Sequence, residues 1–429
     1  MEAKDDAQRR LSLLAAALYA IGGVQVAFFP LWLGARGMGG AEIALILAAC
    51  PAIRIVSNLL GARIGDKYGD YGRLIIVYAA AATMIFVVLG FVQGFYALLF
   101  WVTALAFAQA PIGPLNDGLV LGEVHRRRAL GLPPLNFSSV RGWGSASVLL
   151  FMLASGQIAD ALPADRLIWI MTAISCFTTV TGFFLVRGFA AARARQPEAL
   201  KAPSAPLRRP LLIAAIIACA AIVHGSHGFL TVFASLHWAE RGFDPAFISI
   251  AWATSTFSEV LFFLSAGRWF GGEKKSVSFL MIGSAGAVLR WAIFANDPSA
   301  AGVLFAQALN PLSGSAMALG AAYLIAELGG TEYTARVHGW LGAAYGVALS
   351  FGLYVSGPLE AAFGQRGYLA MSIMAAIGLG FSFAVAAATR NGVLNEKGQE
   401  ASAFQSVDQP ADAASPFETR ASLAPQDEA

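Results

Sequence analysis

The chain has 429 residues, of which 57% are hydrophobic and only 13% are charged, and its formal net charge is +3. A soluble globular protein carries about 25% charged residues, so this chain has too few charges to cover a water-facing surface of its size. Its apolar residues form blocks of about 20, the length of helix that crosses a bilayer. The composition therefore excludes a soluble globular protein and predicts an all-α membrane protein.

Twelve apolar blocks follow one another along the chain, and we predict that each is one transmembrane helix. The first block is too long for the apolar core of a signal peptide, and no clear cleavage site follows it. The predicted spans are 11–33, 41–62, 74–94, 96–121, 140–160, 166–187, 210–236, 245–267, 276–295, 300–326, 338–359 and 367–389.

Basic residues in the connecting stretches predict the orientation of these spans. Of the 29 Lys and Arg residues, 22 fall on the side that carries both termini and four on the other side. Loops rich in Lys and Arg remain in the cytoplasm. We therefore expect a multi-pass protein of the inner (plasma) membrane with both termini in the cytoplasm.

A long basic stretch with several prolines separates the first six spans from the last six. It predicts two six-helix halves joined by a linker. The polar and acidic end of the chain predicts a disordered tail. The predicted regions are an N-terminal half (1–187), a cytoplasmic linker (188–209), a C-terminal half (210–389) and a disordered cytoplasmic tail (390–429).

The two halves share short sequence repeats. The pattern of Leu31, Arg36-Gly37 and Ile43 recurs about 205 residues later, and the segment 107–110 (Phe-Ala-Gln-Ala) recurs at 305–308. Both repeats keep the direction of the chain, so they indicate a parallel duplication. Duplicated transporters of this kind bind substrate near the bilayer midplane, between their halves.

The loop after the second span, 62–73, resembles the gating-loop signature of the major facilitator superfamily. It contains Asp66, Lys67 and Arg73, and alanine stands where the first glycine is usual. The resemblance implies a major facilitator fold with 6+6 pseudo-symmetric halves. It also implies that these three residues gate the cytoplasmic ends of the helices; the alternative is that they only set the topology.

Further motifs resemble the phenylpropionate permease family, relatives of the lactose permease. They are the segments 114–117, 140–145, 258–260 and 289–291, together with His227 upstream of Trp238. A charge at the bilayer centre costs ~2.5–3.5 kcal/mol on insertion scales, so ionisable residues in these segments are candidates for function.

Asp117 and Arg141 form the first candidate pair. Pro111 and Pro114 precede Asp117, and a helix broken by proline suits a cavity wall. The lactose permease binds its sugar with an acid on helix 4 and an arginine on helix 5. The resemblance therefore implies that Arg141 binds a substrate carboxylate or hydroxyl groups; the alternative is a structural ion pair.

Glu259 and Arg290 form the second candidate pair. The resemblance implies that Glu259 carries a proton or contacts substrate and that Arg290 is its partner; a permanent salt bridge is the alternative. Helix 10 lacks any charge between Asp297 and Glu327, so the proton route of the lactose permease cannot be transferred to this chain.

Two further residues complete the candidate site. Arg54 aligns with Glu259 in the repeat, which predicts a charge facing the central cavity; bonds to carbonyl groups near Pro51 are the alternative. His227 is either a polar cavity contact or a core histidine bonded to the backbone. With His224 as its neighbour, no third ligand for zinc is evident.

These observations predict a secondary active transporter and not an enzyme. The expected activity is proton-coupled symport of a small organic solute, such as a phenylpropionate-like aromatic carboxylate. A sugar symporter or a drug efflux pump on the same fold are alternatives, and a membrane sensor or enzyme is an alternative of another class. We expect a monomer whose partners are a small molecule, protons and the lipid bilayer, with no cofactor, metal or nucleic acid.

Overall fold

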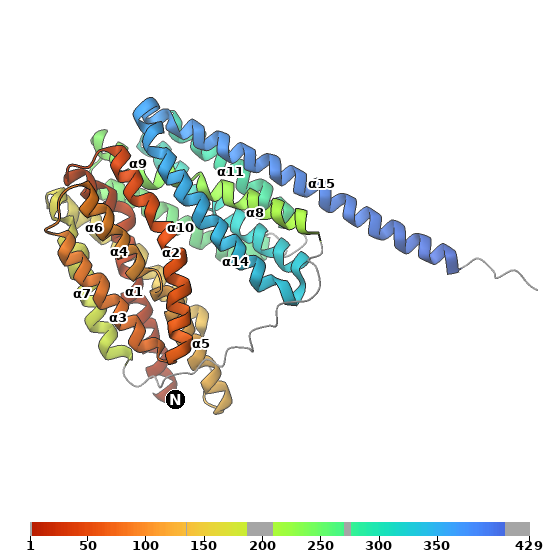
Figure 1. Cartoon of the computed structure of the whole chain (residues 1–429), viewed down its shortest axis with the longest axis horizontal. Coiled ribbons are helices and arrows are strands. Elements are labelled where there is room, and N and C mark those ends of the chain that lie inside the picture. The colour runs from red at the N-terminus through yellow and green to blue at the C-terminus, as the bar shows by residue number, and fades with distance from the viewer. Residues whose placement is uncertain (1, 134, 187–208, 270–275, 408–429) are drawn as a thin grey trace, which may run out of the picture.

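The computed structural model describes residues 2–133, 135–186, 209–269 and 276–407. Over these residues the chain is helical and contains no strand (Figure 1). Nearly all of the predicted linker and the segment 408–429 lie outside the described residues.

The N-terminal half contains seven α-helices and one short 3-10 helix within its described residues. They are α1 (Glu2–Ala35), α2 (Gly40–Tyr68), α3 (Tyr71–Leu89), α4 (Phe95–Gln109), α5 (Ile112–Ala129), α6 (Phe137–Asp160), η1 (Ala164–Arg166) and α7 (Leu167–Val186). We call the side of the bundle on which α1 begins the near side, and the side on which α1 ends and α2 begins the far side.

The C-terminal half follows the same plan. Its described elements are α8 (Pro210–Gly225), α9 (Gly228–Glu240), α10 (Pro245–Trp269), α11 (Ser276–Ala295), α12 (Ala300–Ala308), α13 (Asn310–Ser313), α14 (Ser315–Phe363), η3 (Gly364–Gly367) and α15 (Tyr368–Val407).

Three predicted spans are broken near their middle. The span 96–121 is divided into α4 and α5 at Pro111, and the span 300–326 bends by 47° between α12 and the helical segment that follows it. Proline lacks the N–H that continues a helix and clashes with the preceding turn, which explains the break at Pro111 and the one beside Pro311. The third break, between α8 and α9, falls at Ser226 and His227, which are flanked by glycines.

The helices are long and apolar enough to make this a multi-pass membrane protein. Ten stretches of the described chain meet the length and hydropathy of a membrane span, and the bent pair 300–308 and 310–325 makes eleven. The longest stretch, Val337–Arg390, has 54 residues and contains two predicted spans on either side of Gly364. Each of the twelve predicted spans therefore coincides with one of these helices or with a bent pair.

The helix α14 covers the end of one predicted span and all of the next. Gly320 lies against the Ser276 carbonyl, where α11 begins on the near side. Gly357 lies against Ala41, where α2 begins on the far side. The residues 327–337, which separate the two predicted spans, are part of this helix in the structure.

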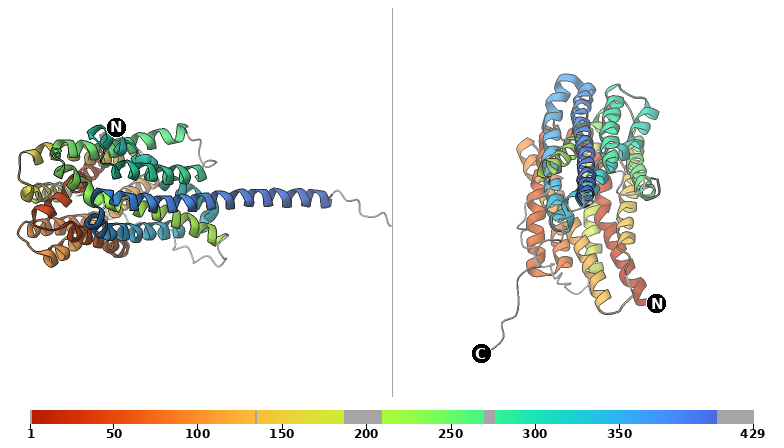
Figure 2. Two further views of the ribbon diagram at one scale, coloured as in Figure 1. Left: turned by 90° about the horizontal axis from the view of Figure 1, so that it is seen from above. Right: turned by 90° about the vertical axis from the view of Figure 1, so that its right-hand side faces the viewer.

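The last helix continues beyond its predicted end. We predicted a disordered tail from Arg390, but α15 runs on to Val407 and projects from the bundle (Figures 1 and 2). The first part of the predicted tail is therefore helical.

The two halves pack against each other on the far side. A Cβ atom at Gly156, near the end of α6, would overlap Ser249 of α10, so glycine is required for this approach. Gly34 of α1 lies against Leu236 of α9 on the same side. Within the described residues, the observed hydrogen bonds and ion pairs of the side chains lie inside one half or the other, and the halves meet there through packing.

Candidate functional site

A cavity of about 390 Å³ lies between the two halves. The helices α1, α2 and α4 of the N-terminal half form most of its wall. Thr231 of α9, Trp252 of α10 and Leu349 of α14 complete it from the C-terminal half. This space, which we call the shared cavity, lies where the sequence repeat predicts a substrate site.

Arg54 is the charged residue that lines the shared cavity. Its side chain is exposed, and within the described residues its guanidinium makes no ion pair and no hydrogen bond. The bonds to carbonyl groups near Pro51 that we weighed as an alternative are not observed there. The structure therefore places Arg54 facing the cavity with its hydrogen-bond donors available.

Two glutamines and two aromatic rings complete the shared cavity. The amides of Gln25 and Gln109 exchange hydrogen bonds of 3.1 and 3.4 Å between α1 and α4. Trp252 and Phe29 supply aromatic surface, and Trp252 Nε1 donates to Ser235 Oγ at 2.9 Å, which fixes the indole ring. The cavity thus offers a cation, two amides and ring faces.

Glu259 lies in a second cavity, of about 190 Å³, which is formed by the C-terminal half alone. Its carboxylate accepts a hydrogen bond of 3.0 Å from Ser315 Oγ, at the start of α14. His224 lines the same space and stacks on Tyr345 at 4.5 Å. We call this space the C-half cavity.

His227 combines the two roles that the sequence left open. One ring nitrogen lies 3.0 Å from the Val223 carbonyl and the other 3.3 Å from Ser313 Oγ, while the ring also lines the C-half cavity. His227 is therefore bonded to the backbone as a core histidine is, and it is also a cavity contact.

Asp117 and Arg141 meet as the sequence predicted. Arg141 Nη1 donates to Asp117 Oδ2 at 2.7 Å, which joins α5 to α6. The arginine side chain is 59% exposed and the aspartate side chain 31% exposed. The pair lines neither the shared cavity nor the C-half cavity.

The predicted partners Glu259 and Arg290 are not in direct contact in this structure. No ion pair joins them within 4 Å in the described part of the chain. Arg290 is fully buried, and it donates to the Ala306 carbonyl at 2.9 Å and to Asn310 Oδ1 at 2.7 Å. It also donates to Ser313 Oγ and to Gln307 Oε1.

These four acceptors explain why Arg290 does not reach Glu259. They surround the break between α12 and α14, where Pro311 cannot supply the N–H that would continue the helix. The guanidinium carries five donors in a fixed fork, and it supplies four of them to this break. Arg290 is therefore a structural crosslink in this conformation.

The gating-loop residues make local contacts only, as far as the structure describes them. Lys67 Nζ lies 5.5 Å from the Tyr68 ring, and Arg73 lies 3.6 Å from Asp70 with its side chain 83% exposed. The side chain of Asp66 lies outside the described residues. Their gating role stays a prediction.

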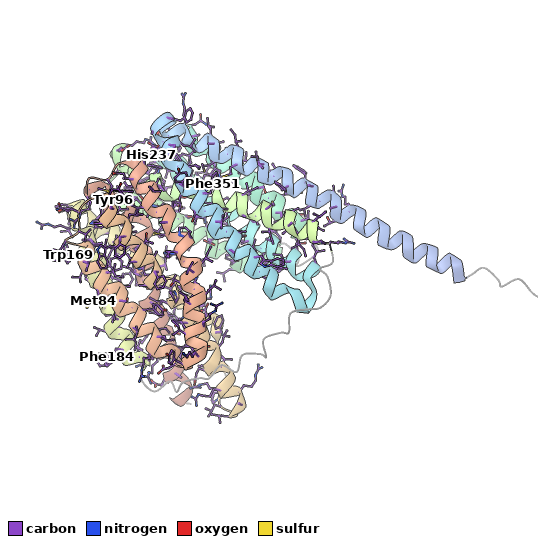
Figure 3. The ribbon with its side chains drawn as sticks, viewed as in Figure 1. Met84, Tyr96, Trp169, Phe184, His237 and Phe351 are labelled. Carbon is purple, nitrogen blue, oxygen red and sulfur yellow. The ribbon has the colours of Figure 1, made fainter. Side chains whose placement is uncertain are left out.

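Sequence reasoning missed two polar pairs. The sequence repeat could have pointed to the Gln25–Gln109 pair, because Gln109 belongs to the repeated segment 107–110. The second pair joins His237 Nε2 to Glu360 Oε1 at 2.9 Å on the far side (Figure 3 labels His237). No sequence pattern links these two residues, which are 123 positions apart.

Solved structures with the same fold are membrane transporters. The nucleoside transporter NupG superposes with a TM-score of 0.76 at 17% identity, covering 89% of this chain and 98% of that one. A bacterial homolog to the human lysosomal transporter Spinster, in an inward-facing and occupied conformation, gives 0.68 at 12% identity, with 88% and 96% covered. The POT family transporter PepTSo gives 0.68 at 11% identity, with 90% and 98% covered.

Sequence comparison defines the family. No curated protein matches the sequence. The model of the MFS_1 like family matches residues 9–368, most of the chain. Together with twelve spans in two halves around a shared cavity, this match shows that the chain belongs to the MFS_1 like family of major facilitator transporters.

Proposed function

We propose that the protein is a proton-coupled symporter of a small aromatic carboxylate, with Arg54 as its anion-binding group. The observation that carries this proposal is the position of Arg54 in the shared cavity, without an acidic partner among the described residues. A cation inside a membrane protein is costly unless it is paired or solvated. A substrate carboxylate would supply the missing charge, and the planar guanidinium can bind it through two hydrogen bonds.

The rest of the shared cavity suits an aromatic substrate. The faces of Trp252 and Phe29 offer stacking surface for one ring. Gln25 and Gln109 bond to each other, so a substrate hydroxyl can take the place of either amide without leaving a buried group unpaired.

Glu259 is the proposed proton carrier. Its one hydrogen bond within the described residues comes from a neutral hydroxyl, that of Ser315. A carboxyl group in such a cavity can be turned from one side of the membrane to the other at a lower cost in free energy when it is protonated. Movement of the halves would expose it to one side and then to the other.

Asp117 and Arg141 are the proposed entry residues. The pair is not enclosed by the protein, so an incoming carboxylate can replace Asp117 on Arg141 before it reaches Arg54. When the near side closes, Asp66, Lys67 and Arg73 would meet the opposite half.

A neutral nucleoside is the second candidate substrate. The Gln25–Gln109 amides present the donor and acceptor edges that a nucleobase pairs with, and the structural relative NupG is a nucleoside transporter. Sugar symport and drug efflux remain further possibilities on this fold.

Uptake by reconstituted vesicles tests the substrate. We expect labelled phenylpropionate to accumulate when the outside is more acidic, and Arg54→Gln to raise its KM at least tenfold. Arg63→Gln, an exposed arginine on the same helix, is the matched control. Uridine accumulation that is insensitive to Arg54→Gln would establish the nucleoside alternative and overturn the carboxylate proposal.

The coupling role of Glu259 has a separate test. We expect Glu259→Gln to abolish accumulation driven by a pH gradient, while exchange of labelled for unlabelled substrate continues because a neutral amide permits the movement of the halves. Ser258→Ala on the same helix is the control. Gradient-driven accumulation by Glu259→Gln would exclude this residue as the proton carrier.

A further inference from the structure

A groove of about 530 Å³ lies between α6 and α7, away from the shared cavity and the C-half cavity. Phe151, Ile158 and Leu162 form one wall, and Trp169 and Ile170 form the other. All its lining residues belong to α6, α7 and the turn between them. Ile158 is 46% and Trp169 41% exposed, and Figure 3 shows Trp169 at the outer edge of the N-terminal half. The groove therefore opens to the outside of the bundle, where the bilayer lies.

The groove has the depth of one leaflet. The helix α6 ends at Asp160 and α7 begins at Leu167, so its mouth lies where these spans leave the membrane. Along a helix, the nine steps from Phe151 to Asp160 cover about 14 Å. Half of a typical hydrocarbon core is about 15 Å. An apolar groove of this depth matches an extended acyl chain.

Arg166 stands at the mouth of the groove. It lines the groove, it is exposed, and within the described residues it forms no ion pair. A guanidinium binds a phosphate through parallel hydrogen bonds. Asp160 and Asp165 lie at the same end and are exposed. Two acids beside one arginine favour a head group that carries an ammonium as well as a phosphate.

The aromatic wall is fixed before any ligand arrives. Trp169 packs edge to face on Phe91 with a centroid distance of 5.3 Å, and Gly90 leaves room for the indole. Tryptophan at this level of the membrane is typical of the interface between lipid and water. The wall thus needs no rearrangement to receive a chain.

We propose that this groove binds a bilayer phospholipid of the phosphatidylethanolamine type. One acyl chain occupies the groove, and the phosphate pairs with Arg166. The proposal does not depend on which solute the protein transports.

Photo-crosslinking tests the proposal. The full-length protein is reconstituted with phosphatidylethanolamine that carries a diazirine in one acyl chain, and the crosslinked peptides are identified by mass spectrometry. We expect crosslinks concentrated in residues 151–174. Arg166→Gln should reduce them about tenfold, the effect of losing a charge-assisted hydrogen bond. Ala154→Trp, which fills the groove, should reduce them similarly.

Arg366→Gln is the matched control, because Arg366 occupies the corresponding turn, η3, of the C-terminal half and does not line the groove. It should leave the crosslinks unchanged. Arg166 is exposed, so its variant tests the proposal even if Ala154→Trp fails to fold. Crosslinks that spread evenly over the protein, that favour phosphatidylglycerol, or that ignore Arg166→Gln would overturn the proposal. A homodimer whose interface covers the groove would also overturn the proposal.

Discussion

Arg141 in the N-terminal half and Arg290 in the C-terminal half are both membrane-embedded arginines, but their surroundings differ. Arg141 has one acidic partner and a side chain that is 59% exposed. Arg290 is fully buried and donates to four oxygen atoms on and beside a broken helix. The exposed pair can separate and exchange partners, whereas the buried arginine cannot leave without abandoning its acceptors. An intramembrane charge alone therefore does not identify a transport residue.

The two broken helices also differ in the groups that bond to them. In the N-terminal half the Phe107 carbonyl, before the break at Pro111, accepts a hydrogen bond from the Ser57 hydroxyl. In the C-terminal half the Ala306 carbonyl, at the corresponding break, accepts from Arg290. A serine hydroxyl thus satisfies a carbonyl before the first break, whereas an arginine does so at the second.

The largest effect is expected from removing the buried arginine. Arg290→Met would leave buried acceptors without donors, and we expect a loss of about 3 kcal/mol or more in the free energy of unfolding. Denaturation in lipid bicelles measures this loss, with the exposed Arg73→Met as the control. A variant that keeps its stability but loses transport would make Arg290 a transport residue and end the contrast with Arg141.

A smaller loss of stability is expected when one of the hydrogen-bond acceptors of Arg290 is removed. Asn310→Ala removes one of the four oxygen atoms while Arg290 stays bonded to the others, so we expect a loss of about 1–2 kcal/mol. The same denaturation measures it, and Asn296→Ala at the exposed end of α11 is the control. Additive losses in the double variant Asn310→Ala/Arg290→Met would show that the two side chains do not act together.

The smallest effect on stability is expected from the exposed pair. A double-mutant cycle with Asp117→Asn and Arg141→Gln should give a coupling energy below about 1 kcal/mol, because solvent screens the charges. Transport should respond more strongly than stability. A coupling energy as large as that between Asn310 and Arg290 would show that Arg141 has a structural role instead.

The sequence predicted the scaffold well, because hydropathy and basic loops follow directly from the bilayer. It also predicted that Asp117 meets Arg141, and a charge facing the central cavity was one of its two interpretations of Arg54. It did not predict the acceptors of Arg290, because pairing by charge ignores the neutral oxygen atoms around a helix break. Pro311, next to Asn310 and four residues after Gln307, was the available signal. The His237–Glu360 contact depends on the register of distant helices, which local patterns do not encode.

The glycines at the far-side contact have a consequence for the speed of the transport cycle. A contact without directional bonds has no single bond whose rupture sets the barrier, because each dispersion contact contributes only about 0.1–0.2 kcal/mol. Around Gly156 the two halves can roll over one another and lose attraction gradually. Because this approach requires glycine, Gly156→Ala should already hold the far-side ends of the halves apart and shorten the time that this side stays shut.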